Sequence, residues 1–194
     1  MDFLDQTRTH ELLSALGEQL AARAARVELV VIGGSALLAV GLISRTTRDV
    51  DIVAFLSGRT LVDPRPLPEA LVSARDRVAR DFGLPEGWLN AGPADLLDFG
   101  LPDGFVERLE RRDYGRALAV HFASRLDQVH LKLYAMADQT AAKHEADLRA
   151  LEPTNDELVA AARWTRTHDP SEGFLEQLVA ALAYLGVNDV DLDS

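Results

Sequence analysis

The sequence predicts an α/β fold over residues 1–123 and an all-helical region over residues 124–194. Three patterns support this division. An apolar, β-branched run at residues 30–32 stops at two glycines, as a buried strand does. Residues 49–53 alternate between acidic and apolar side chains, which is typical of a second strand. Residues 126–142 return to apolar positions at helical spacing, and no strand pattern follows them.

Composition limits the kind of protein this can be. The chain has 194 residues, of which 47% are hydrophobic and 26% charged, enough for one buried domain with a helical annex. No apolar run approaches the roughly 20 residues that span a bilayer. The N-terminal residues are charged and amphipathic, unlike a secretory signal. We therefore expect a cytoplasmic protein that does not contact a membrane.

Charge and cysteine content exclude several kinds of site. The chain has no cysteine, which excludes disulfides, thiolate zinc sites and cysteine nucleophiles. Any metal ion must therefore be held by oxygen or imidazole. The formal net charge of -11 argues against a general nucleic-acid binder, because such proteins usually carry a basic excess. A local basic groove remains compatible with this net charge.

The first elements lead into the central stretch of the chain. Residues 3–26 carry leucines at helical spacing, with acids early and arginines late, and predict a surface helix. The strand at residues 30–32 follows, then an apolar helix at residues 36–42 and the alternating strand at residues 49–53. Residues 54–68 contain one glycine and three prolines and predict a loop.

The middle of the chain predicts a helix, then a loop rich in glycine and proline, then two strands. Residues 69–82 predict a helix that ends at Gly83. Glycine and proline then punctuate the chain as far as residue 104. Residues 105–113 and 117–123 predict two strands joined around Tyr114 and Gly115, and the second has the clearer alternation.

The C-terminal region predicts helices only. Helical spacing or helix-start signals occur at residues 126–142, 143–151, 154–167 and 172–185. Thr154 stands at the N-cap position of the third helix and Glu157 at the position that completes a capping box.

The chemistry concentrates between residues 30 and 53. A helix that begins near Gly34 and Ser35 directs its free backbone N–H groups toward whatever lies against that turn, which makes a phosphate site. Asp49 and Asp51 alternate with apolar residues and therefore project from the same strand face. Two carboxylates about 4 Å apart repel by roughly 4 kcal/mol at an effective dielectric near 20, so we expect a cation between them.

The chemistry of the metal-ligating side chains indicates which cation and which substrate to expect. Carboxylate oxygens without a neighbouring histidine or cysteine favour Mg²⁺ or Mn²⁺, which in turn hold substrate phosphates. The glycine turn and the two acids together predict a metal-bound nucleoside triphosphate. The expected reaction is an in-line displacement at phosphorus with pyrophosphate as the leaving group.

These motifs resemble a known superfamily. Gly33-Gly34-Ser35 followed by Asp49-x-Asp51 is similar to the signature of the nucleotidyltransferases that include DNA polymerase β-like enzymes. The likeness is closer to the AbiEii-like and MenT-like nucleotidyltransferases, which are toxins of toxin–antitoxin systems. Further matching segments are Arg45-Thr46-Thr47-Arg48-Asp49, Trp88-Leu89-Asn90, Lys132 within HLKLYA, and Asp147-Leu148.

The resemblance implies a mixed-sheet nucleotidyltransferase fold and a role for each matching residue. Asp49 and Asp51 would bind the metal, and Lys132 would contact the phosphates or the transition state. Asp147 would complete or orient the site. The nucleotide-binding residues would be Gly33, Gly34, Ser35 and Arg48. The implied partners are a nucleoside triphosphate, a tRNA 3′ end as acceptor and an antitoxin protein.

Several alternatives remain open at this stage. Many members of the superfamily carry a third acid on a neighbouring strand, whereas the strand at residues 117–123 offers His121. A non-catalytic member that binds a nucleotide or a partner protein is therefore an alternative. Modification of a cationic small molecule is another, because the net charge is acidic. Lys132 and Asp147 could instead be exposed residues on the surfaces of their helices. Trp88 could instead pack in the core or at an interface.

Overall fold

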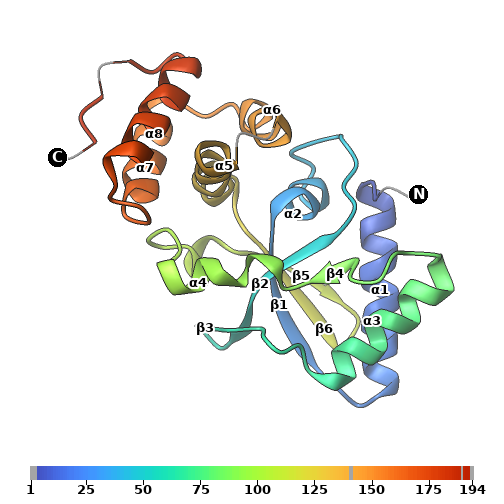
Figure 1. Cartoon of the computed structure of the whole chain (residues 1–194). Helices are drawn as coiled ribbons and strands as arrows, with labels where there is room; N and C mark the ends of the chain where they lie inside the picture. Colours follow the sequence, from blue (N-terminus) through green and yellow to red (C-terminus); the bar gives the residue numbers. More distant parts are fainter. Residues whose placement is uncertain (1–3, 140–141, 189, 193–194) are drawn as a thin grey trace. The chain divides into compact units, whose positions relative to one another are not determined.

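The computed structural model describes residues 4–139, 142–188 and 190–192 (Figure 1). It divides into two compact units, Met1–Ser124 and Arg125–Ser194, and each is described by itself. Within the described residues, no helix has both the length and the apolar character needed to cross a lipid bilayer.

The first unit is built on a mixed six-stranded sheet of order β3-β2-β1-β6-β5, with β4 paired to β2. β1 lies antiparallel to β2 and parallel to β6, and the β2–β4 pair is parallel. This arrangement confirms a mixed α/β fold. The strands are β1 (Val27–Ile32), β2 (Val50–Ser57), β3 (Thr60–Val62), β4 (Leu89–Asn90), β5 (Glu110–Tyr114) and β6 (Leu118–Phe122).

Two long helices, α1 (Gln6–Ala22) and α3 (Glu69–Phe82), pack with one face of this sheet into the main core (Figure 1). Buried leucines of α1 meet apolar residues that alternate along β1, β2 and β6. α3 begins and ends where the sequence predicts, because Gly83 takes the left-handed conformation, with φ +69°, that terminates a helix. The core therefore holds the three central strands in fixed register.

Shorter helices complete the first unit. α2 (Gly33–Ala39) follows β1 directly, and α4 (Leu96–Phe99) follows the 3₁₀ turn Gly92–Asp95. The predicted helix at residues 36–42 thus begins earlier and ends earlier. A second 3₁₀ turn, Val106–Arg108, precedes β5.

Two predictions for this unit are wrong. Residues 54–68 are not a continuous loop, because β2 runs on to Ser57 and pairs with β3 across a turn at Gly58, where φ is +61°. Residues 105–113 are not one strand, because Val106–Arg108 is helical and pairing with β6 begins only at Glu110. Both errors come from weak local patterns that cross-strand pairing overrides.

The second unit has helices and no strand within its described residues, as predicted. Its helices are α5 (Arg125–Gln139), α6 (Ala142–Ala150), α7 (Asn155–Arg166) and α8 (Glu172–Tyr184). Residues 140–141 of the helix predicted at residues 126–142 lie outside the described residues. The predicted capping box at Thr154 and Glu157 is present. Arg125 donates to both oxygens of Glu157, at 2.8 and 2.9 Å, and these hydrogen bonds lower the pKa of Glu157 to about 2. The start of α5 is thereby tied to the start of α7.

Gly17 provides a test of the α1 packing. A Cβ atom at this position would lie 2.1 Å from the carbonyl oxygen of Tyr114 at the end of β5. Since a backbone atom in a packed sheet has little room to move, we expect Gly17→Ala to lower the free energy of unfolding by about 3 kcal/mol. Equilibrium unfolding in urea measures this change.

The matched control is Gly173→Ala in α8, where a Cβ atom would meet nothing within 4 Å. This change should be neutral or stabilise by up to about 1 kcal/mol, because alanine favours helix. A Gly17→Ala protein as stable as the wild type would contradict the packing described for α1.

Candidate functional site

The glycine turn between β1 and α2 has no room for side chains. Gly33 has a φ of +77°, which disfavours other residues, and a Cβ atom there would lie 3.0 Å from Oδ2 of Asp51. A Cβ atom on Gly34 would lie 3.1 Å from Oγ1 of Thr47 and 3.3 Å from Nη2 of Arg45. The backbone of the turn therefore lies directly against an acid on one side and a guanidinium on the other.

Ser35 follows the two glycines and is only 1% exposed. Its hydroxyl has no hydrogen-bond partner within the described part of the chain. A buried hydroxyl without a partner costs stability, so such groups are rare unless something outside the protein satisfies them. The orphaned hydroxyl of Ser35 is therefore consistent with a ligand at the glycine turn.

Asp51 lies in β2 opposite Ile32 of β1. Its neighbours Val50 and Ile52 belong to the core with α1 and α3, so Asp51 projects from the opposite face of the sheet. Asp49 directly precedes β2 instead of lying within it. Alternation along an extended chain directs Asp49 to the same side as Asp51.

The two carboxylates have different surroundings. Oδ1 of Asp51 accepts a hydrogen bond of 3.2 Å from Nδ2 of Asn90. Asp49 is half-buried, and its carboxylate makes no hydrogen bond or ion pair with any described residue. Asp51 is therefore held in place, and Asp49 keeps both oxygens available for an additional ligand.

The loop between α2 and β2 places Arg45 at the turn. Arg45 is half-buried, donates to the carbonyl of Thr46 at 3.1 Å, and brings Nη2 close to Gly34. Arg48, the arginine predicted from the sequence to bind nucleotide, is exposed. Its role stays a prediction. Arg45 belongs to the same Arg-Thr-Thr-Arg-Asp run as Arg48. The sequence of this run does not show which of the two arginines lies against the glycines.

β4 carries Asn90, which the sequence named only as part of the Trp88-Leu89-Asn90 match and to which it gave no role. Asn90 lies level with Asp51 in the parallel β2–β4 pair and donates to it. Trp88, two residues earlier, is 1% exposed and donates from Nε1 to the carbonyl of Arg75 at 3.2 Å. The core-packing reading of Trp88 is thus confirmed, and this packing anchors the strand that presents Asn90.

No third acid lies on the same face of β6. The residues that alternate onto this face are Ala119, His121 and, just past the strand, Ala123. His121 contacts Oε2 of Glu28 through Nε2 at 3.0 Å. Across the described residues there is no group of three or more histidine, cysteine, aspartate or glutamate side chains able to hold a metal.

This donor set fits one type of metal site. Mg²⁺ is usually held by one or two carboxylates together with substrate phosphates and water, and seldom by an all-protein cage. Asp51 beside a glycine turn with an unsatisfied hydroxyl, together with Asp49 two residues earlier in the chain, matches that arrangement. The residues therefore suit a Mg²⁺ ion that arrives with a nucleotide.

Lys132 and Asp147 lie together in the second unit. Nζ of Lys132 in α5 is 2.7 Å from Oδ2 of Asp147 in α6, and the two side chains are 7% and 1% exposed. The alternative that both residues lie exposed on the surfaces of their helices is therefore wrong. A buried charge of either sign is costly without its partner, so each residue stabilises the charged form of the other.

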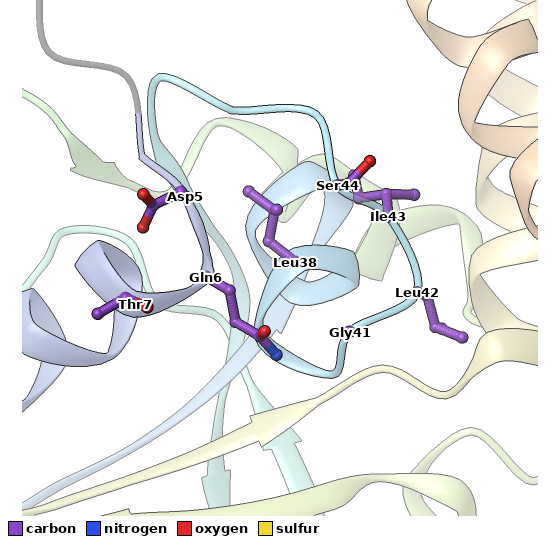
Figure 2. A pocket seen from close by; sticks show the side chains of 8 residues that line it. All are labelled: Asp5, Gln6, Thr7, Leu38, Gly41, Leu42, Ile43 and Ser44. Atoms are coloured by element: carbon purple, nitrogen blue, oxygen red, sulfur yellow. The ribbon is translucent and has the colours of Figure 1, made fainter.

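A surface hollow in the first unit is lined by none of the candidate residues (Figure 2). It is bounded by the start of α1 and by the end of α2 with the loop that follows it. Its lining residues are Asp5, Gln6, Thr7, Leu38, Gly41, Leu42, Ile43 and Ser44. Because neither the glycine turn nor either acid lines it, this hollow is not the site described above.

Residues 10–150 match a family model described as "Nucleotidyltransferase of unknown function (DUF6036)". The chain belongs to this family. As a nucleotidyltransferase, it has both acids, the glycine turn and the Lys132–Asp147 pair within the matched region. The match confirms the prediction of a nucleotidyltransferase family, and the closer likeness to AbiEii-like and MenT-like enzymes stays a prediction. No curated protein and no solved structure matches the chain.

The buried ion pair of this nucleotidyltransferase can be tested through stability. Lys132→Met removes the cation that lies 2.7 Å from the buried Asp147 carboxylate, and we expect a loss of about 3–5 kcal/mol in the free energy of unfolding. Lys132→Met combined with Asp147→Leu removes both charges and should cost much less. Urea denaturation of the three proteins gives the comparison.

Lys143, the only other lysine, is exposed and provides the control. Lys143→Met should change stability by less than about 0.5 kcal/mol. Equal losses for Lys132→Met and Lys143→Met would show that the buried pair does not stabilise the second unit.

Proposed function

We propose that this protein transfers a nucleoside monophosphate from a nucleoside triphosphate to an acceptor in a Mg²⁺-dependent reaction. The observation that carries the proposal is the contact between the glycine turn and Asp51, where Oδ2 would lie only 3.0 Å from a Cβ atom on Gly33. A phosphate bound at the turn is thereby next to a carboxylate that can hold its metal ion.

Each candidate site residue of the first unit has a defined role in the proposed reaction. Asp49 and Asp51 would hold Mg²⁺, which supplies positive charge to the phosphates and to the pyrophosphate leaving group. The absence of side chains at Gly33 and Gly34 lets phosphate oxygens approach the backbone. Ser35 donates its otherwise unused hydroxyl to a phosphate oxygen. Arg45 adds a fixed positive charge beside Gly34.

Lys132 and Asp147 of the second unit are further proposed site residues, and the sequence resemblance alone supports this role. The Asp147 carboxylate lies 2.7 Å from the buried Nζ of Lys132 and favours the charged form of this lysine. By the resemblance to AbiEii-like and MenT-like enzymes, Lys132 would contact the phosphates or the transition state, and Asp147 would complete or orient the site. The pair thus has both a structural and a proposed chemical role.

The proposed acceptor is a tRNA 3′ end, in a toxin–antitoxin setting where an antitoxin protein restrains the enzyme. This part of the proposal rests on the same resemblance. A cationic small molecule is the second candidate acceptor, because the net charge of -11 attracts positively charged compounds.

The first test is nucleotide transfer itself. Purified protein is incubated with Mg²⁺, each α-labelled nucleoside triphosphate in turn, and either tRNA or an aminoglycoside-like amine. We expect label on tRNA. Asp49→Asn and Asp51→Asn should each lower the rate at least about 100-fold, because each removes a charge that holds the metal. Ser35→Ala should lower it about tenfold, the effect of one hydrogen bond to a charged group.

Asp103→Asn is the matched control, since Asp103 is an exposed acid of the same unit and lies outside the candidate site. Its rate should equal that of the wild type. Transfer to the amine alone would select the small-molecule acceptor. Nucleotide binding without transfer to any acceptor would contradict catalysis and identify a nucleotide-binding protein.

A further inference from the structure

Asn90 makes two hydrogen bonds that fix the direction of its amide. Its Oδ1 accepts from the backbone N–H of Gly92 at 2.8 Å, and its Nδ2 donates to Oδ1 of Asp51 at 3.2 Å. Because only the oxygen of the amide can accept from an N–H, the NH₂ group must face Asp51. The Asn90 amide therefore links the backbone at Gly92 to the carboxylate of Asp51.

The strand that carries Asn90 is held firmly. The backbone N–H of Val50 donates to the carbonyl of Trp88 at 2.6 Å, and Asn90 pairs with Asp51 in register. The Trp88 ring is buried and donates to Arg75 of α3. Asn90 is thus presented by a paired strand with a buried anchor, which favours a constant position for its amide.

Both oxygens of Asp51 consequently face protein groups. Oδ1 accepts from Asn90, and a Cβ atom built on Gly33 would lie 3.0 Å from Oδ2. The hydrogen bond fixes the orientation of the carboxylate and occupies one lone pair of Oδ1, which favours metal binding through Oδ2 alone. A metal ion beside Asp51 then binds through a single oxygen.

The mode of binding matters for the choice of metal. Mg²⁺ requires near-ideal octahedral geometry at short distances, which single-oxygen carboxylate ligands satisfy. Ca²⁺ takes six to eight oxygens at longer distances and often uses both oxygens of one carboxylate. A carboxylate restricted to one oxygen therefore favours Mg²⁺ over Ca²⁺.

We propose that Asn90 is a positioning residue that restricts Asp51 to single-oxygen coordination and thereby gives the site its preference for Mg²⁺ over Ca²⁺. The inference rests on the proposed function, in which Asp49 and Asp51 hold the metal. In this proposal Asn90 acts through its hydrogen bond to Asp51.

Competition for bound Mn²⁺ tests this proposal without relying on turnover. The full-length protein is mixed with Mn²⁺ and a non-hydrolysable nucleoside triphosphate, and electron paramagnetic resonance follows displacement of Mn²⁺ by Mg²⁺ or by Ca²⁺. We expect Asn90→Ala to weaken Mg²⁺ binding about 10- to 100-fold, the usual effect of removing a group that orients a metal ligand. Ca²⁺ binding should change by less than about threefold, because Ca²⁺ accepts both carboxylate oxygens.

Gly92→Ala provides a second variant that keeps the Asn90 side chain. A Cβ atom at Gly92 would lie 2.9 Å from Oδ1 of Asn90 and would displace the amide from Asp51. It should shift the Mg²⁺-to-Ca²⁺ preference in the same direction as Asn90→Ala, by a smaller factor. Gly173→Ala, with open space around its Cβ position, should leave the preference unchanged.

The outcomes separate the two proposals. A wild-type protein that binds no Mn²⁺ in the presence of nucleotide overturns the proposed function, and the role of Asn90 with it. If the wild type binds Mn²⁺ while Asn90→Ala and Gly92→Ala keep its Mg²⁺-to-Ca²⁺ preference within twofold, only the inference about Asn90 is overturned. A loss of preference confined to these two variants supports it.

Discussion

The close approach of the Gly33 backbone to the Asp51 carboxylate is the constraint on which the first unit's site depends. It requires β1 and β2 to pair with Ile32 opposite Asp51, and the core beneath α1 and α3 maintains this register. It also favours a glycine, because φ at Gly33 is +77° and a Cβ atom there would lie 3.0 Å from Oδ2. One backbone contact therefore joins the phosphate turn to an acid of the proposed metal site.

Around this contact the protein keeps polar groups that its own residues do not satisfy. The Ser35 hydroxyl is buried without a partner, and the Asp49 carboxylate has no partner among the described residues. Such groups reduce stability unless a ligand occupies them. In the second unit, by contrast, Lys132 and Asp147 neutralise one another in a buried pair. The first unit thus has the properties of a binding site that a charged substrate completes.

The sequence was informative wherever a local pattern determines structure. It predicted α3 with its glycine stop, the capping box of α7 and the glycine turn, since each depends on residues close together in the chain. It could not show that Asn90 bonds to Asp51, because 39 positions separate them and only the pairing of β4 with β2 brings them together. The sequence also did not show which arginine of the Arg45–Arg48 run lies at the turn, because the fold of the loop decides it. The Lys132–Asp147 contact depends on how α5 and α6 pack, which the sequence pattern does not specify.

The central claim is that the turn and the acids form one site for a metal-bound triphosphate. A crystal structure with Mn²⁺ and a non-hydrolysable nucleoside triphosphate tests it most directly, because the anomalous scattering of Mn²⁺ locates the ion independently of the model. The account predicts an anomalous peak within coordination distance of Asp49 and Asp51, with the phosphates against Gly33, Gly34 and Ser35. A triphosphate bound elsewhere, or a metal ion that touches neither acid, would contradict it.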